Sequence, residues 1–134
     1  MISSKSSETE VPNKQSINMK LEIDNIEIPV IWENNVATQE LRQRTTNEPI
    51  RVHTERYAQF EQVGKLPFSL FREDIKQTAQ PGDIILYQGD YIVIFYGKHS
   101  WSYTKLGSIQ RLSPSEVNEL LNKTNTQIEI IAKE

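Results

Sequence analysis

The stretch PGDIILYQGDYIVIFYG, residues 81–97, is the most apolar part of this 134-residue chain. Its two runs, DIILY and YIVIFY, flank Gln88-Gly89-Asp90, a segment typical of a β-hairpin turn. The second run is apolar on both faces, with Ile92, Ile94 and Tyr96 opposite Tyr91, Val93 and Phe95. A strand of this kind is covered on both sides, so we expect it at the centre of the fold.

A second hairpin is predicted before it. Residues 17–23 and 26–32 each alternate apolar and polar side chains, and Asp24-Asn25 between them suits a two-residue turn. We expect two faces to be buried: Ile17, Met19, Leu21 and Ile23 on the first strand, and Ile26, Ile28, Val30 and Trp32 on the second. Pro29 favours an edge or a bulge.

Two more strands and two short helices are predicted. Residues 50–55 alternate with Ile50, Val52 and Thr54 inward, and residues 127–132 form a closing strand. Asn34 or Asn35 caps a helix that continues to about residue 44. Ser113, Pro114 and Glu116 are the cap, first and third positions of a second helix.

The segment 63–83 between these elements is predicted to be a long loop. Gly64, Pro67 and Pro81-Gly82 interrupt it, and Leu66, Phe68, Leu70 and Phe71 are expected to anchor it to an apolar surface. Loops of this length within one domain are uncommon and often functional.

The order of these elements predicts one mainly β domain, a closed or nearly closed antiparallel barrel with two short helical caps. We expect this domain to cover residues 17–134. Residues 1–16 are polar and offer almost nothing to bury, so they are predicted to be a disordered tail.

Composition excludes several classes of function. The chain has no Cys and a formal charge of -3, so thiolate chemistry is excluded and nucleic acid is not an expected partner. No apolar run is long enough for a membrane span, and the N-terminus lacks the apolar core of a secretory signal. We expect a cytoplasmic protein without a membrane partner.

No catalytic constellation is visible, and no cofactor or metal is expected. The two histidines, His53 and His99, have no partners at metal-ligand spacing, and there is no Gly-x-Ser-x-Gly or phosphate-binding loop. A basic group is interspersed with glutamates and reads as a solvated face in preference to an anion site: Arg42, Arg44, Arg51, His53 and Arg56.

The segment SWSYTKLGSI, residues 100–109, offers the first candidate site. Trp101, Tyr103 and Lys105 share one face of an extended chain, which is interpreted first as the lining of a core. The alternative is a shallow ligand site, because Lys105 indicates that this face opens to solvent. The other candidates follow the strand 50–55: Arg56, Tyr57 and Phe60.

Residues 19–109 resemble the cyclophilin-like domain family of mostly uncharacterised bacterial and archaeal proteins. The resemblance rests on five segments in the same order: MKLEI, NVATQEL, LPFSL, PGDIILYQGDYIVIFYG and SYTKLGSI. It implies a closed eight-stranded antiparallel barrel capped by helices, and it implies no particular function.

True prolyl isomerases of the cyclophilin type use an Arg in a Phe-His-Arg strand and a Gln-Gly-Gly segment that follows. Here Thr54-Glu55 separates His53 from Arg56 and the region after it reads YAQFEQVGK, so no isomerase residue is carried over. Arg56 and Gln62 are only the nearest analogues in type.

Three hypotheses remain open at this stage. The first is a non-catalytic binding module that holds a short peptide or small metabolite in an aromatic and Arg-lined groove. The alternative is a weak or divergent peptidyl-prolyl isomerase, whose chemistry needs no acid-base pair. The third is a structural partner protein, and the ligand and oligomeric state stay open.

Overall fold

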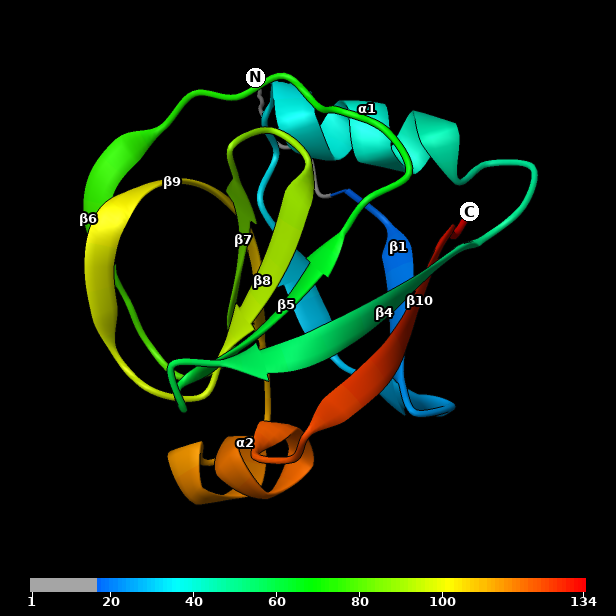
Figure 1. Ribbon diagram of the computed structural model, residues 1–134. Helices are drawn as coiled ribbons and strands as arrows, with labels where there is room; N and C mark the ends of the chain where they lie inside the picture. Colours follow the sequence, from blue (N-terminus) through cyan, green and yellow to red (C-terminus); the bar gives the residue numbers. More distant parts are fainter. Residues whose placement is uncertain (1–16) are drawn as a thin grey trace, which may run out of the picture.

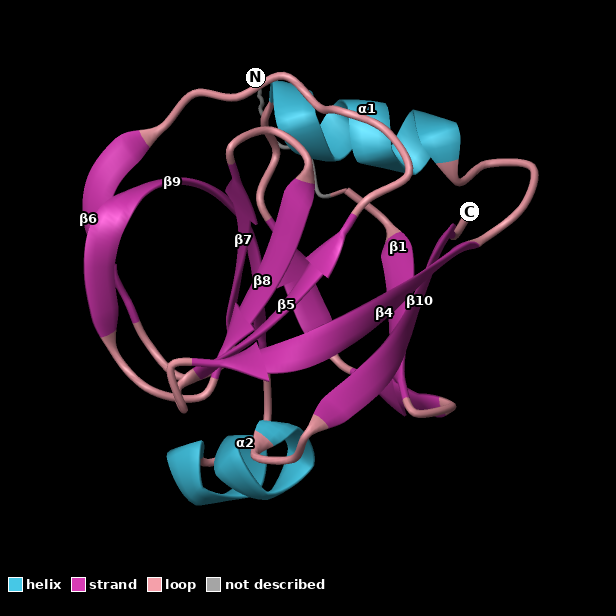
Figure 2. Cartoon of the chain, in the orientation of Figure 1, coloured by secondary structure: helices cyan, strands magenta, loops and turns pink. Residues whose placement is uncertain are grey.

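The computed structural model describes residues 17–134, so the predicted tail at residues 1–16 lies outside the described residues. Within this range the chain forms strands and two helices around a barrel, shown in Figure 1 and Figure 2. In chain order they are β1 (Met19–Ile23), β2 (Ile26–Ile28), β3 (Val30–Trp32), α1 (Val36–Arg44), β4 (Ile50–Tyr57), β5 (Glu61–Lys65), β6 (Ile75–Ala79), β7 (Asp83–Tyr87), β8 (Tyr91–Phe95), β9 (His99–Ile109), α2 (Pro114–Leu121) and β10 (Asn125–Ala132).

The barrel is a nearly closed antiparallel sheet, which confirms the predicted fold class. Among the described residues its strands follow the order β2-β1-β10-β4-β5-β8-β7-β9-β3, one strand more than the resemblance implied, and β6 pairs only with β9. At the seam, Ile17 bridges to Trp32, and the Trp32 indole Nε1 donates a hydrogen bond to the Met19 carbonyl at 3.0 Å. The two ends of the sheet are thereby joined.

The run IEIPVIW is not the single strand that its alternation predicted. Pro29 has no N–H to donate, and the chain divides there into β2, which pairs with β1, and β3, which pairs with β9. Ile28 and Trp32 are buried as expected, whereas Ile26 is 60% exposed at the end of the β1–β2 hairpin.

The central hairpin β7–β8 divides its apolar side chains between two cores, as the sequence predicted. Ile92 and Ile94 belong to the core inside the barrel, together with Leu41 of α1 and Val117 of α2. Side chains of opposite parity form a second core outside the barrel wall: Ala79, Ile85, Val93, Phe95 and Tyr103.

The predicted loop 63–83 contains the second half of strand β5 and the whole of β6, and this is the main correction to the sequence analysis. Gly64 does not end an element but lies inside β5, where β4 approaches closely. A Cβ on Gly64 would lie 2.5 Å from Val52 Cγ1 and 2.7 Å from the His53 carbonyl oxygen, so glycine is required by space. Of the expected anchors, Leu66 and Leu70 are buried and Phe71 is exposed.

Strand β9 serves two sheets. Its residues 104–108 pair with β7 in the barrel wall, and its residues 99–103 pair with β6 away from the wall. The register with β7 shifts between Ile84 and Ile85, which leaves Leu106 as an extra residue, and a bulge of this kind bends a strand. The ribbon of β6 and the first half of β9, here called the flap, arches over the outer face of the barrel (Figure 1).

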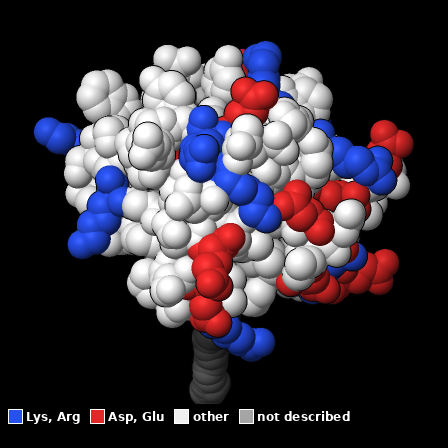
Figure 3. Space-filling model, turned by 60° about the horizontal axis from the view of Figure 1, so that its bottom comes forward, with Lys and Arg blue, Asp and Glu red and all other residues white. Residues whose placement is uncertain are grey.

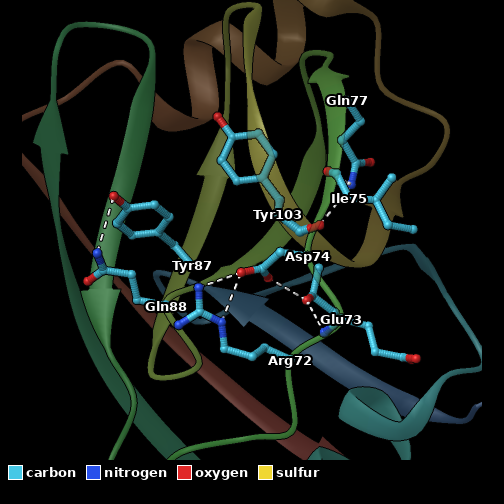
Figure 4. Close-up of polar contacts among 9 residues, drawn as sticks. Arg72, Glu73, Asp74, Ile75, Gln77, Tyr87, Gln88 and Tyr103 are labelled. Atoms are coloured by element: carbon cyan, nitrogen blue, oxygen red, sulfur yellow. Dashed lines mark hydrogen bonds and ion pairs between the residues drawn. The ribbon is translucent and has the colours of Figure 1, made fainter.

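Side-chain contacts fix the flap where it leaves the barrel. The Thr104 hydroxyl donates to Asp74 Oδ1 at 2.8 Å and accepts from the Glu73 backbone N–H at 2.8 Å. Arg72 donates to Asp74 Oδ2 from both Nε and Nη2, at 2.9 and 2.5 Å, as the close-up in Figure 4 shows. The start of β6 is therefore held against β9 at Thr104.

Both predicted helices are present with their predicted caps. Asn35 caps α1 and Ser113 caps α2, each through a capping box with the residue at the third helical position. The buried faces carry Leu41 in α1 and Val117 and Leu121 in α2.

A buried polar network attaches the C-terminal end of α2 to the barrel. The Gln62 amide donates to the carbonyls of Leu121 at 2.9 Å and Lys123 at 2.6 Å, and it accepts from the Thr54 hydroxyl at 2.9 Å. Thr54 also bonds Thr126 at 2.5 Å, and all three side chains are buried. The amide therefore satisfies carbonyls that a helix end otherwise leaves unpaired.

We expect Gln62→Leu to lower the free energy of unfolding by about 2 to 3 kcal/mol, because it leaves buried polar partners unpaired. Urea denaturation measures this change. Gln43→Leu, on the exposed face of α1, is the matched control and should change stability by less than about 0.5 kcal/mol. Equal effects of the two variants would contradict this role of Gln62.

Candidate functional site

A pocket of about 640 Å³ lies on the outer face of the barrel, between the β5–β8–β7 wall and the flap. Its floor and walls are the outward-facing side chains of these strands and the turn before β5. The lining residues are Tyr57, Ala58, Phe60, Glu61, Val63, Tyr87, Gln88, Tyr91, Val93, His99, Trp101 and Tyr103. Seven of these twelve residues carry an aromatic ring, so the pocket is an aromatic one.

The rings of the pocket pack against one another. His99 lies 4.8 Å from Phe60 and 6.5 Å from both Trp101 and Tyr103, centroid to centroid. Phe95, beneath the lining, contacts Tyr103 edge to face at 5.6 Å. Such contacts stabilise the walls beyond simple burial, and they hold one end of the pocket in a fixed shape.

Glu61 is the carboxylate of this pocket. Strand register places it opposite Phe95 on one side and Tyr57 on the other, so its side chain shares their face of the sheet. Burial among these apolar groups raises the pKa of Glu61 from 4.5 to about 7. Within residues 17–134, no side chain forms a hydrogen bond or ion pair with this carboxylate.

Tyr103 and Tyr87 line the same pocket as Glu61. Burial first, and then the charges of Glu61 and Tyr87, raise the pKa of Tyr103 to about 12. The Tyr87 hydroxyl accepts a hydrogen bond from Gln88 Nε2 at 3.4 Å, and Figure 4 shows this contact, with Tyr103 on another strand. The polar groups of the pocket thus include one carboxylate, several tyrosine hydroxyls, the Gln88 amide and the His99 ring.

The structure brings together four of the five residues predicted as ligand-binding. Tyr57, Phe60, Trp101 and Tyr103 all line the pocket, although their role in binding stays a prediction. Arg56 is not among the lining residues; its guanidinium donates to Asn122 Oδ1 at 3.1 Å at the end of α2. The reason is strand alternation, because Arg56 has the opposite parity to Tyr57 in β4.

The sequence left open whether one face of residues 100–109 lines a core or faces an open site, and in the structure it is partly each. Tyr103 is buried in the second core, whereas Trp101 is 56% exposed at the pocket. Lys105 lies on the same side and reaches Asp83 at 3.7 Å. One face of β9 is therefore partly a core lining and partly the wall of an open pocket.

Sequence reasoning did not single out Glu61, Tyr87 or Tyr91 for the pocket, and it considered His99 only as a possible metal ligand, without partners at the required spacing. Strand alternation could have identified two of these residues. Glu61 stands two positions from Val63, and Tyr91 two positions from Val93, so each pair lies on one face of its strand. For Glu61, this alternation is informative only when β5 is recognised as a strand.

The basic residues that the sequence placed on a solvated face do not form a charged site among residues 17–134. The five basic residues of the predicted solvated face have separate contacts, such as Arg51 with Glu129 at 3.1 Å and Arg44 over the Phe68 ring at 4.7 Å. Figure 3 shows acidic and basic side chains interspersed on the face seen from the α2 end. Among the described residues, no group of three His, Cys, Asp or Glu could hold a metal ion, and no helix is long and apolar enough to cross a membrane.

Glu61 should make the stability of the domain depend on pH. Because its pKa is raised in the folded state, its contribution to stability is greatest below pH 4.5 and is lost as the pH rises through about 7. Relative to Glu61→Gln, the parent protein should lose about 1 to 2 kcal/mol of unfolding free energy between pH 5 and pH 8, after allowance for solvent screening.

Urea denaturation at the two pH values measures this difference. Glu119→Gln removes the same charge from the exposed face of α2 and should follow the parent protein. Parallel pH dependence of the Glu61→Gln variant and the parent would show that the carboxylate is not desolvated.

Comparison with known proteins identifies a family and a solved structure that are similar to this chain. A family model described as "Cyclophilin-like family" matches residues 21–131. The solved structure of McbB in complex with tryptophan superposes with a TM-score of 0.58 at 12% sequence identity, covering 87% of this chain and 45% of that chain. This chain thus spans less than half the length of that neighbour, and no curated protein matches the sequence significantly. Since the family match covers most of its length, the chain belongs to the cyclophilin-like family.

Proposed function

We propose that this domain is a binding module that holds a small metabolite, or one side chain of a short peptide, in the aromatic pocket. The observation that carries the proposal is the pocket itself: about 640 Å³ lined by seven aromatic rings, in one concave site. Pockets of ~300–1,000 Å³ with mostly apolar walls and a few convergent polar groups are typical of small-molecule sites.

The exposure of Trp101 supports this function over a purely structural role for the rings. A 56% exposed indole at the mouth of a pocket leaves apolar surface in water. A flat ligand placed between the flap and the barrel wall would cover that surface and gain the free energy of its burial.

The structural neighbour agrees with a ligand of this kind. McbB, which shares the fold, is in complex with tryptophan, a small molecule with an aromatic ring. At 12% identity the likeness supports the fold, and for this chain an aromatic ligand is our inference from the pocket walls.

The alternative of a divergent prolyl isomerase has less support. That hypothesis needs Arg56 beside the bound proline, but Arg56 contacts Asn122 outside the pocket. Gln62, the other analogue in type, is buried and bonded to the end of α2. The pocket lining therefore contains no Arg or Lys to polarise a prolyl amide.

Titration with indole, followed by two-dimensional NMR of ¹⁵N-labelled protein, tests the proposal. We expect shifts of the Trp101 side-chain N–H and of Val63 and Val93, whereas the Trp32 N–H, which bonds Met19 inside the barrel, should not move. Trp101→Ala should weaken binding about fivefold or more, since it removes a stacking wall. Phe71→Ala, which removes another exposed ring outside the pocket, is the matched control.

A proline-containing tetrapeptide examined in the same way separates the hypotheses. Faster cis/trans exchange of the peptide would favour the isomerase. Absence of binding by both indole and the peptide would overturn the proposed binding module.

A further inference from the structure

We infer that the ligand carries an ammonium group, and that Glu61 receives this cation between the aromatic rings of the pocket. The inference rests on the proposed function and deepens it, because it names the chemical class of the ligand: an organic amine with an apolar or aromatic body.

The charge of the lining is the first observation. Of the twelve lining residues, Glu61 is the only acidic one, and no Lys or Arg is present among them. Lys65 and Lys105, the nearest lysines along β5 and β9, are paired with Asp90 at 2.5 Å and Asp83 at 3.7 Å. The pocket therefore offers one negative group and no fixed positive one.

The missing partner of this carboxylate is the second observation. The acidic residues just named, Asp90 and Asp83, have lysine partners, and Asp74 is held by Arg72 and Thr104. Glu61 is half-buried and has no such contact within residues 17–134. A desolvated carboxylate without a hydrogen-bond donor is unfavourable, and a bound N–H donor would remove that cost.

The aromatic surroundings are the third observation. Tyr57 and Phe95 flank Glu61 across the two strand pairs, and the pKa of Tyr103 responds to its charge. Ring faces attract cations and repel anions, so rings around a carboxylate favour an ammonium ligand over a carboxylate ligand. The raised pKa of Tyr103, about 12, keeps its phenol neutral at ordinary pH, and the hydroxyl oxygens of Tyr103 and Tyr87 can accept hydrogen bonds from an ammonium.

Other titratable groups at the pocket do not change this preference. Burial raises the pKa of Tyr96, which lies in the core inside the barrel, and Arg56, on the opposite face of β4 from Tyr57, contacts Asn122. His99 packs between Phe60 and Trp101, and a histidine can become positive, so the test is made at pH 8.

Three indoles of matched shape test the inference by isothermal titration calorimetry at pH 8: tryptamine, 3-ethylindole and 3-indolepropionate. They share the ring and differ in carrying an ammonium, no charge or a carboxylate. We expect tryptamine to bind about tenfold or more tightly than 3-ethylindole, and 3-indolepropionate to bind most weakly.

The Glu61→Gln variant should bind tryptamine and 3-ethylindole within about threefold of each other, with little change for 3-ethylindole. Glu61→Asp, which keeps the charge, should retain part of the preference. Glu119→Gln makes the same change in net charge outside the pocket and should leave the preference intact.

The outcomes separate this inference from the proposed function. Equal binding of all three indoles to the parent protein, or an unchanged preference in Glu61→Gln, overturns the role of Glu61 and leaves the binding module in place. If none of the three binds, the aromatic pocket is not a site for such ligands and the proposed function fails with it.

Discussion

Strands β7 and β8 carry apolar side chains on both faces, and each face has to be covered. The barrel interior covers one face, where Ile92 and Ile94 pack with the helices. The flap, β6 with the first half of β9, covers part of the other, where Val93 and Phe95 meet Tyr103. Because the flap covers that second face only partly, an aromatic pocket remains open between it and the barrel wall.

The pocket contains a carboxylate whose charged form is unfavourable in the folded protein. Glu61 lies between Tyr57 and Phe95 with its pKa raised to about 7, so its charged form is destabilised by the folded structure. Residues with strongly shifted pKa values are common at functional sites, where a ligand supplies the interaction that the protein does not. The same region also holds backbone strain, since Ala58 and Gln59 in the preceding turn both have positive φ.

The sequence predicted the elements whose signals are local. The β7–β8 hairpin has alternation with a turn at Gln88-Gly89-Asp90, and the helix α2 has Ser113, Pro114 and Glu116 at its start. Strand β5 was missed because its turn, Ala58-Gln59, lacks the usual Gly, Asn or Asp. Gly64 suggested a loop, whereas the close approach of β4 is what requires it, and such contacts are set by tertiary structure.

The sequence predicted only part of the site, because the rest depends on contacts that tertiary structure sets. The aromatic residues Tyr57, Phe60, Trp101 and Tyr103 come from two segments 40 residues apart, and only the arching of β9 over the barrel brings those segments together. The position of Glu61 depends on the parity of the missed strand, and the position of Arg56 on the end of β4. Side-chain type identified the rings, and three-dimensional pairing was needed to identify the carboxylate.

The division of β8 between two cores also bears on how such a domain can diversify. Ile92 and Ile94 maintain the barrel, while Tyr91 and Val93, on the other side of the same strand, face the pocket. Substitutions of Tyr91, which belongs to neither core, can alter the pocket wall without removing a buried side chain. Descendants of one ancestral barrel can therefore acquire different ligands while they inherit the same inner face.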